Sequence, residues 1–150
     1  MECYSALFDQ VSIPIDRYHI PGTSGVKIRH ELPRGLMHYP HLAGIKDCNG
    51  PPTEYASFVK AFPELNMRAG TENNIEHALA HGMGAICMDG NVYTRQLADV
   101  FAAFCAGKDN HAAFQKYVAA TKVMEDLTTG VDNYGPMKYA LSLQMGGTQT

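Results

Sequence analysis

Short apolar runs alternate with helical stretches along most of the chain, and this alternation restricts the fold more than any other feature. Four runs have strand character, being short and apolar or β-branched, and turn-forming residues close them; they span residues 13–20, 42–46, 65–70 and 85–88. Strands separated by helices run parallel, because each crossover returns the chain to the same edge of the sheet. The pattern therefore predicts an α/β fold.

The helical stretches carry apolar residues at spacings of three and four. One helix is predicted to begin at Thr53 and to end at Pro63. The clearest helix ends before Gly107 and has a single apolar stripe, formed by Leu97, Val100, Phe101, Phe104 and Cys105. These stripes indicate helices that pack one face against a core.

Other helices are predicted from weaker signals. Asn73 and Glu76 have the spacing of a capping box, which predicts that Asn73 caps a helix ending at Gly82. Further helices are expected within residues 31–39, from about residue 113 to near Gly130, and over residues 136–145.

A chain of 150 residues, 45% of them hydrophobic, can bury one core, so one domain is expected. Four strand–helix units are half of a (β/α)8 barrel. We therefore expect residues 1–150 to form a single partial barrel, with strand–helix units at about 11–107 and a C-terminal helical extension at about 108–147. Such barrels place their chemistry on the loops that follow the strands, where Tyr18 and Lys46 lie.

The charge and the cysteines favour a small-molecule partner in a reducing compartment. The formal net charge is -3 and the basic residues are scattered, which argues against nucleic acid or an anionic membrane as the main partner. The four cysteines are widely spaced and form no C-x-x-C pair, so reduced thiols are expected. No apolar run has membrane-spanning length and the first residues lack signal-peptide character, so we expect a cytoplasmic protein.

Lys46 is the most informative position, because it ends an apolar run. Its amine must either reach water or lie desolvated with a lowered pKa. A desolvated, neutral amine can attack a ketone carbonyl and form an imine, which permits carbon–carbon cleavage or formation at the neighbouring carbon. Spacing alone leaves both interpretations open.

The other candidates also have two interpretations. Tyr18 is placed to relay protons beside Lys46 or to pack at the barrel rim with its hydroxyl in water. The loop of residues 21–25 offers amides and hydroxyls that could hold a carboxylate. His77 and His81 share a helix face but have no evident third metal ligand, and Cys48 has no adjacent histidine that would favour a thiol nucleophile.

Two motifs together resemble one known family. Residues 18–25, Tyr-His-Ile-Pro-Gly-Thr-Ser-Gly, are similar to the Tyr-Asn-(Ile/Val)-Pro-x-x-(Thr/Ser)-Gly motif of the dihydrodipicolinate synthase / N-acetylneuraminate lyase family. Residues 44–50, Gly-Ile-Lys-Asp-Cys-Asn-Gly, resemble that family's Gly-(Ile/Leu)-Lys-x-(Ser/Thr/Ala)-x-Gly. Residues 70–72 and 84–91 follow in the family's order. The resemblance covers nearly the whole chain and implies the C-terminal half of a TIM barrel.

The resemblance also implies the roles of single residues. Lys46 would be the lysine that forms a Schiff base with pyruvate or another 2-oxo acid, and Tyr18 would be the proton-relay tyrosine. The implied substrate-binding residues are Thr23, Ser24, Gly70, Glu72, Ile86 and Met88. Class I aldolases of this kind use the covalent imine, so the resemblance implies neither a metal nor a dissociable cofactor.

Departures from the family pattern bear on the substrate. Thr23 stands where dihydrodipicolinate synthases carry an arginine for the dicarboxylate, which favours a sugar-acid or 4-hydroxy-2-oxo acid substrate. Asn73 and Met88 do not reproduce the pattern that N-acetylneuraminate lyases use on the sugar chain. The aldehyde partner therefore stays open, and so does a hydratase or dehydratase reaction through the same imine.

Nothing in the chain matches the family's Gly-Thr-Thr-Gly-Glu loop or its earlier relay tyrosine, both of which belong to the first half of the barrel. Four strands leave unpaired sheet edges, which invite pairing with another chain. We therefore expect a homo-oligomer, pairing with a complementary half-barrel, aggregation, or a fragment of a longer reading frame. The alternative to a lyase is a truncated, non-catalytic half-barrel that only associates with another subunit.

Overall fold

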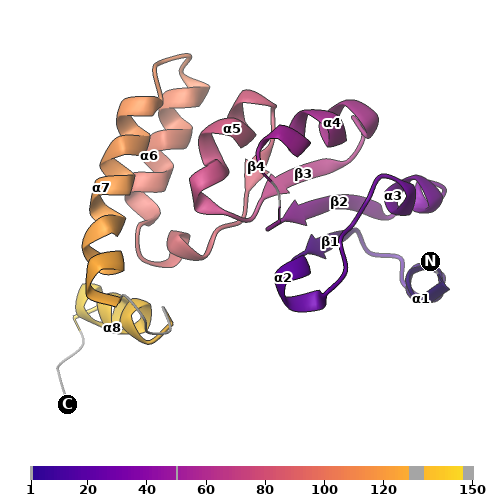
Figure 1. Ribbon diagram of the computed structural model, residues 1–150, viewed down its shortest axis with the longest axis horizontal. Coiled ribbons are helices and arrows are strands. Elements are labelled where there is room, and N and C mark those ends of the chain that lie inside the picture. Colours follow the sequence, from indigo (N-terminus) through magenta and orange to yellow (C-terminus); the bar gives the residue numbers. More distant parts are fainter. Residues whose placement is uncertain (1, 50, 129–133, 147–150) are drawn as a thin grey trace. The chain divides into compact units, whose positions relative to one another are not determined.

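The computed structural model describes residues 2–49, 51–128 and 134–146. The chain divides into two compact units, Met1–Cys87 and Met88–Thr150. The first unit contains the sheet and the second is helical, as the labels in Figure 1 show. The prediction that residues 1–150 form one domain stays a prediction.

The first unit alternates strands with helices. Its elements in chain order are α1 (Glu2–Phe8), β1 (Ile15–His19), α2 (Pro21–Ser24), α3 (Glu31–Leu36), β2 (Leu42–Asp47), α4 (Thr53–Ala61), β3 (Asn66–Ala69), the 3-10 helix η1 (Glu72–Asn74), α5 (Ile75–Ala80) and β4 (Gly84–Ala85). The strands lie in the order β1-β2-β3-β4 and every neighbouring pair is parallel. The predicted α/β class with four parallel strands is confirmed.

The second unit contains the 3-10 helix η2 (Met88–Asn91) and the helices α6 (Thr94–Cys105), α7 (His111–Thr128) and α8 (Tyr134–Gln144). Leu97 and Val100 of α6 are buried, whereas Phe104 and Cys105 are exposed, so the predicted apolar stripe is only partly covered. The predicted end of a helix near Gly130 lies outside the described residues, as does Gly50 of the second motif. Among the described residues, no helix combines the length and the apolarity needed to cross a membrane.

Two sequence-based predictions were wrong in detail. The run at 85–88 was expected to be a strand, but β4 comprises Gly84–Ala85 and Met88 already belongs to η2. Asn73 was expected to cap a helix, yet it lies inside η1, and the residue at the N-cap of α5 is Asn74, which makes no side-chain capping hydrogen bond. The 3-10 turn adds residues between the strand and the helix, which displaces the cap.

The two faces of the sheet differ in character because successive side chains of a strand point to opposite sides. One face is buried with the core and presents Arg17, His19, Ile45, Asp47, Met67 and Ala69. The other face, hereafter the open face, presents mostly polar side chains that are exposed or half-buried: Asp16, Tyr18, Lys46, Asn66 and Arg68. A parallel sheet normally has both faces covered. The open face thus corresponds to the inside of a barrel that this unit only half surrounds.

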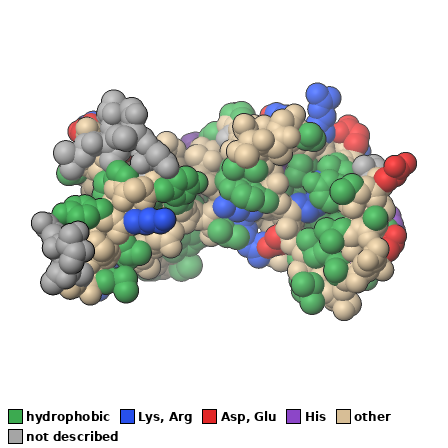
Figure 2. Space-filling model, turned by 90° about the horizontal axis from the view of Figure 1, so that it is seen from below, with side chains coloured by type: hydrophobic (Ala, Val, Ile, Leu, Met, Phe, Trp, Pro, Cys, Tyr) green, Lys and Arg blue, Asp and Glu red, His purple; other side chains and the backbone are tan. Residues whose placement is uncertain are grey.

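Helices and loops supply the core beneath the buried face. Its members include Phe8 of α1, Leu36 of α3, Ile45 of β2 and Tyr55 of α4, each at most 1% exposed. Basic side chains occur at separate places among hydrophobic and other side chains on the face of the molecule in Figure 2. This view agrees with the scattered basic residues of the sequence.

Arg17 is an unusual member of the buried face. It is 3% exposed, and its three guanidinium nitrogens have no hydrogen-bond partner among the described residues. The guanidinium does contact the Tyr4 ring of α1, whose centroid lies 4.0 Å from Arg17 Cζ. A cation–π contact offsets part of the desolvation cost of a buried charge, and the unmade hydrogen bonds remain costly.

Replacing Arg17 by methionine is expected to stabilise the protein. Arg17→Met keeps an unbranched apolar stem and removes the buried charge, so the free energy of unfolding should rise by about 1–3 kcal/mol. Urea unfolding followed by circular dichroism measures this change. Lys60→Met, which removes an exposed cation from α4, is the matched control and should change stability little. A less stable Arg17→Met protein would show that the guanidinium is satisfied.

Candidate active site

Tyr18 and Lys46 meet on the open face at the carboxyl ends of neighbouring strands. The parallel register places Tyr18 of β1 opposite Lys46 of β2. Lys46 Nζ lies 4.2 Å from the centroid of the Tyr18 ring. Tyr18 is 52% exposed and Lys46 is half-buried, so both groups can be reached from the open face. The structure therefore brings together the amine and the phenol that the sequence singles out.

Gly70 provides the space that the Lys46 side chain occupies. It directly follows β3, and a Cβ atom added there would lie 2.1 Å from Cys48 Sγ and 2.8 Å from Lys46 Cε. Real Cβ atoms do not approach other atoms so closely. Any side chain at this position would therefore displace Cys48 and Lys46, whereas the role of Gly70 in substrate binding stays a prediction.

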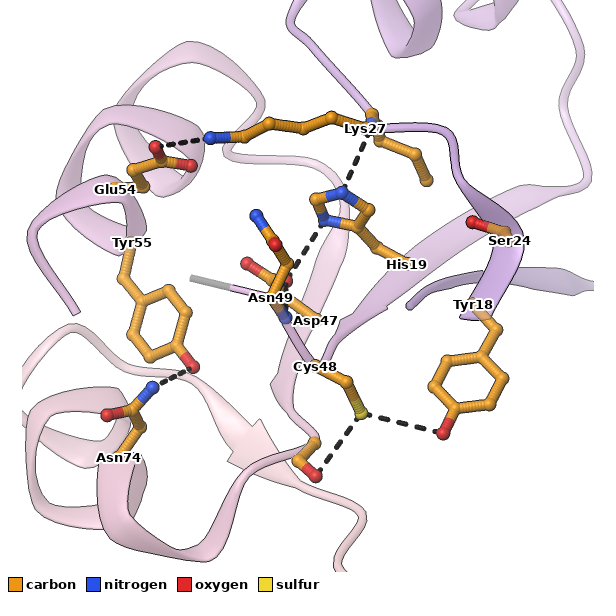
Figure 3. A network of polar contacts seen from close by, with 12 residues as sticks. Tyr18, His19, Ser24, Lys27, Asp47, Cys48, Asn49, Glu54, Tyr55 and Asn74 are labelled. Atoms are coloured by element: carbon orange, nitrogen blue, oxygen red, sulfur yellow. Dashed lines mark hydrogen bonds and ion pairs between the residues drawn. The ribbon is translucent and has the colours of Figure 1, made fainter. Parts of the chain in front are cut away.

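Cys48 lies beside this pair, although it was not among the site residues predicted from the sequence. Its Sγ is 3.2 Å from the Gly70 carbonyl oxygen and 3.6 Å from the Tyr18 hydroxyl oxygen (Figure 3). A carbonyl oxygen only accepts, so we assign the single thiol proton to Gly70, which leaves the sulfur lone pairs to accept from the Tyr18 hydroxyl. The sequence signals that could have found it are that Cys48 stands two residues after Lys46, directly after β2, and occupies the Ser/Thr/Ala position of the second motif.

These neighbours raise the pKa of Tyr18 above its usual value. The hydrogen bond with Cys48 is the largest cause, followed by burial of part of the ring, while Lys46 acts in the opposite direction. A sulfur that accepts the phenolic hydrogen favours the protonated phenol, which agrees with this direction. Tyr18 therefore keeps its proton at neutral pH and can donate it.

A buried pair lies directly behind Tyr18 and Lys46, on the other face of the sheet. His19 Nδ1 is 3.0 Å from Asp47 Oδ1, and both side chains are nearly inaccessible. His19 Nε2 accepts a hydrogen bond of 2.9 Å from the Ile28 amide, and Asp47 Oδ1 accepts one of 2.8 Å from the Asn49 amide (Figure 3). Sequence reasoning missed this network.

Backbone and side-chain contacts connect the three loops around the site. The Cys48 amide donates to the His19 carbonyl at 2.8 Å, and the Gly70 amide donates to the Asp47 carbonyl at 2.7 Å. Further out, Asn74 Nδ2 donates to the hydroxyl of buried Tyr55 at 3.1 Å, and burial raises the pKa of Tyr55. The loops after β1, β2 and β3 are thus held in a defined arrangement.

The remaining predicted substrate-binding residues lie on other segments of the chain: in α2, in η1, after β4 and in η2. Thr23 and Ser24 are exposed in α2, and the Ser24 hydroxyl bonds to the backbone of Val26 at 3.3 Å. Glu72 is half-buried in η1, and Ile86, 46% exposed, donates its amide to the Ala69 carbonyl at 2.9 Å. Met88 begins η2 in the second unit, where it lines an apolar hollow of about 250 Å³ with Val92 and Met137. Their roles in binding stay predictions.

Metal-ligand geometry is absent from the described part of the chain. His77 and His81 are both exposed, and no group of three His, Cys, Asp or Glu side chains in residues 2–49, 51–128 and 134–146 could hold a metal ion.

Four parallel strand–helix units with a lysine at the carboxyl end of one strand and a tyrosine on its neighbour define half of a TIM-type barrel site. Residues 2–148 match the model of the dihydrodipicolinate synthetase family. The chain belongs to this family.

Individual relatives agree with the assignment. The chain is 30% identical over 146 residues to 4-hydroxy-tetrahydrodipicolinate synthase of Anaplasma marginale, covering 93% of this chain and 46% of the relative. It is also 30% identical over 128 residues to a DapA-like lyase of Chloroflexus aurantiacus, covering 83% and 42%. The chain spans half or less of the length of the curated relatives that it matches.

Solved structures show the same fold. Dihydrodipicolinate synthase of Bacteroides thetaiotaomicron superposes with a TM-score of 0.81 at 21% identity, covering 95% of this chain and 50% of the other. YagE of Escherichia coli K12, solved in complex with pyruvate, gives a TM-score of 0.80 at 20% identity, covering 95% and 49%. The predicted half of a (β/α)8 barrel is confirmed.

Removing the Cys48 thiol is expected to lower the pKa of Tyr18. Cys48→Ala deletes the hydrogen-bond partner that contributes most to the raised pKa, so the Tyr18 phenol should titrate at lower pH than in the parent protein. Carbon-13 NMR of ring-labelled tyrosine, assigned with Tyr18→Phe, follows this titration.

Cys105→Ala, which removes an exposed thiol of α6, is the control and should leave the titration unchanged. A Tyr18 titration that is unchanged or moved upward in Cys48→Ala would contradict the assigned direction of the hydrogen bond.

Proposed function

We propose that Lys46 forms an imine with pyruvate or another 2-oxo acid, and that the chain supplies this half of the active site of a class I aldolase-type lyase. The observation that carries the proposal is the position of Lys46 Nζ, 4.2 Å from the Tyr18 ring centroid at the carboxyl ends of paired strands. Family membership supports it, as does the pyruvate bound in the similarly folded YagE structure.

The chemistry begins with the neutral Lys46 amine. Its lone pair attacks the keto carbon, the carbon–nitrogen bond forms, and the former carbonyl oxygen leaves as water once it has been protonated. The Tyr18 hydroxyl is the neighbouring acid, because its ring lies against the Lys46 amine, and it donates a proton to that oxygen. Tyr18 and Lys46 thus have complementary roles, as proton donor and nucleophile.

The protonated imine at C2 then withdraws electrons from the C3–C4 bond, one carbon further along the chain. In a 4-hydroxy-2-oxo acid this bond breaks as the 4-hydroxyl gives its proton back to the Tyr18 phenolate, which releases an aldehyde and leaves an enamine on Lys46. Protonation of the enamine carbon and addition of water release pyruvate and regenerate the amine. The covalent imine supplies the electron sink, so the proposed reaction uses neither a metal nor a dissociable cofactor.

The proposed substrate class rests on the exposed hydroxyl groups in the loop after β1. Thr23 stands where the synthases carry an arginine for the dicarboxylate, and its exposed hydroxyl can donate to and accept from the hydroxyl groups of a sugar acid or a 4-hydroxy-2-oxo acid. We therefore include a substrate of this type in the proposal. The name 4-hydroxy-tetrahydrodipicolinate synthase belongs to the relatives, and it does not assign their reaction to this chain.

Because the open face is uncovered, the proposed active site is incomplete in this unit alone. Half of the barrel interior is uncovered, and the sheet ends at β1 and β4 in the described residues. A complete pocket needs a second wall, which we assign to a complementary half-barrel or to a second copy of the chain. The same observation favours the alternative function, a non-catalytic half-barrel that only associates with another subunit.

Borohydride trapping tests the proposal. The chain is incubated with pyruvate and sodium borohydride, and intact mass is measured; we expect one reduced pyruvyl adduct, absent from Lys46→Ala. Lys60→Ala, which removes an exposed amine of α4, controls for unspecific reaction and should still be trapped.

The trapping is repeated over a range of chain concentrations beside sedimentation analysis. We expect the adduct yield to follow the fraction of associated chain. A folded, associated chain without any adduct would favour the non-catalytic alternative, whereas equal trapping in a monomer would contradict the need for a second wall.

A further inference from the structure

His19 connects two parts of the site from behind the sheet. It belongs to β1 and is only 2% exposed, and the register places it opposite Asp47 of β2. Its two ring nitrogens have different partners, the Asp47 carboxylate at 3.0 Å and the Ile28 amide at 2.9 Å. Both contacts lie within the first unit.

These partners specify one protonation state of the ring. The Ile28 amide is a donor, so Nε2 must offer a lone pair. A carboxylate only accepts, so Nδ1 must carry the hydrogen. A single species satisfies both contacts, namely neutral imidazole with its proton on Nδ1. Protonation of Nε2 would turn the acceptor into a donor that faces the Ile28 amide.

The two contacts hold the loops that carry the candidate residues. Ile28, 4% exposed, ends the loop that contains α2, and therefore Thr23 and Ser24. Asp47 immediately follows Lys46, and its Oδ1 also accepts from the Asn49 amide at 2.8 Å, which fixes the turn that carries Cys48. One buried pair thus fixes both loops relative to the Tyr18–Lys46 centre.

We propose that His19, as the neutral Nδ1-protonated tautomer paired with Asp47, is a positioning residue that locks the loop of residues 20–28 onto the active site. This inference deepens the proposed function, because the locked loop is the one assigned to the 2-oxo acid substrate.

The length of the histidine side chain matters for this role. The family motif resembled by residues 18–25 has asparagine at this position. An asparagine amide reaches about as far as Nδ1, so it can contact Asp47 but falls short of Ile28. A glutamine amide reaches about as far as Nε2, so its carbonyl can accept from Ile28. His19→Asn and His19→Gln therefore separate the two contacts.

Nitrogen NMR tests the tautomer without any assumption about activity. The full chain is labelled at its seven histidines, and the His19 signals are assigned by their loss in His19→Asn. We expect a lone-pair nitrogen at Nε2 and a protonated one at Nδ1 at neutral pH. A His19 ring protonated at Nε2 at neutral pH overturns the proposal.

Amide hydrogen exchange tests the locking of the loop. The Ile28 amide should exchange roughly tenfold faster in His19→Asn, as expected for loss of one hydrogen bond, and at nearly the parent rate in His19→Gln. His77→Asn, which changes an exposed histidine, is the matched control. An Ile28 exchange rate that is the same in the parent and His19→Asn proteins contradicts the locking role.

A third readout separates this inference from the proposed function. Among proteins that form the imine, His19→Asn should need a higher pyruvate concentration for half-maximal trapping than the parent, while the maximal trapping rate changes less. Trapping that is equal at every pyruvate concentration overturns the positioning role. If the parent itself is never trapped, the proposed function fails, whereas the tautomer and exchange results still decide the role of His19 in holding the loop.

Discussion

The parallel pairing of β1 with β2 is the constraint on which the rest of the site depends. Its register sets Tyr18 opposite Lys46 and His19 opposite Asp47. Because neighbouring residues of a strand point to opposite faces, one register creates two different environments. The open face receives an amine and a phenol, and the buried face receives a histidine–carboxylate pair that holds the loops. A shift of one residue would move the amine into the core and break both pairs.

The open face has the chemistry of a barrel interior. Arg68 of β3 pairs with Asp16 of β1 across the sheet at 2.5 Å. Gly44 of β2 leaves room for this layer, because a Cβ atom there would lie 2.1 Å from the Asn66 carbonyl oxygen and 2.6 Å from Asp16 Oδ1. Gly70 does the same for Lys46 in the layer above. Polar side chains over small residues are what the interior of a covered pocket requires.

The sequence predicted those parts of the structure that depend on local patterns. Apolar runs and turn formers located the strands, and their parallel order placed Tyr18 beside Lys46. The roles of Cys48 and Asp47 were not predictable, because each depends on a partner that is distant in the chain and close only through register. Asn73 was wrongly predicted to cap the helix, because the 3-10 turn η1 lies between β3 and α5. Such a turn has no simple spacing of residue types that the sequence would reveal. Because arginine is charged, Arg17 would be expected at the surface, yet it lies in the core.

In the proposed mechanism, the Tyr18 hydroxyl donates a proton while the Lys46 amine forms the imine. The most direct test is the rate of imine formation with pyruvate in Tyr18→Phe, measured by quenching with borohydride at successive times. This variant keeps the ring against Lys46 and removes only the hydroxyl. If Tyr18 acts as this proton donor, trapping becomes slower by about a hundredfold or more, with a similar final yield. An unchanged rate would contradict it and would leave Tyr18 with a packing role alone.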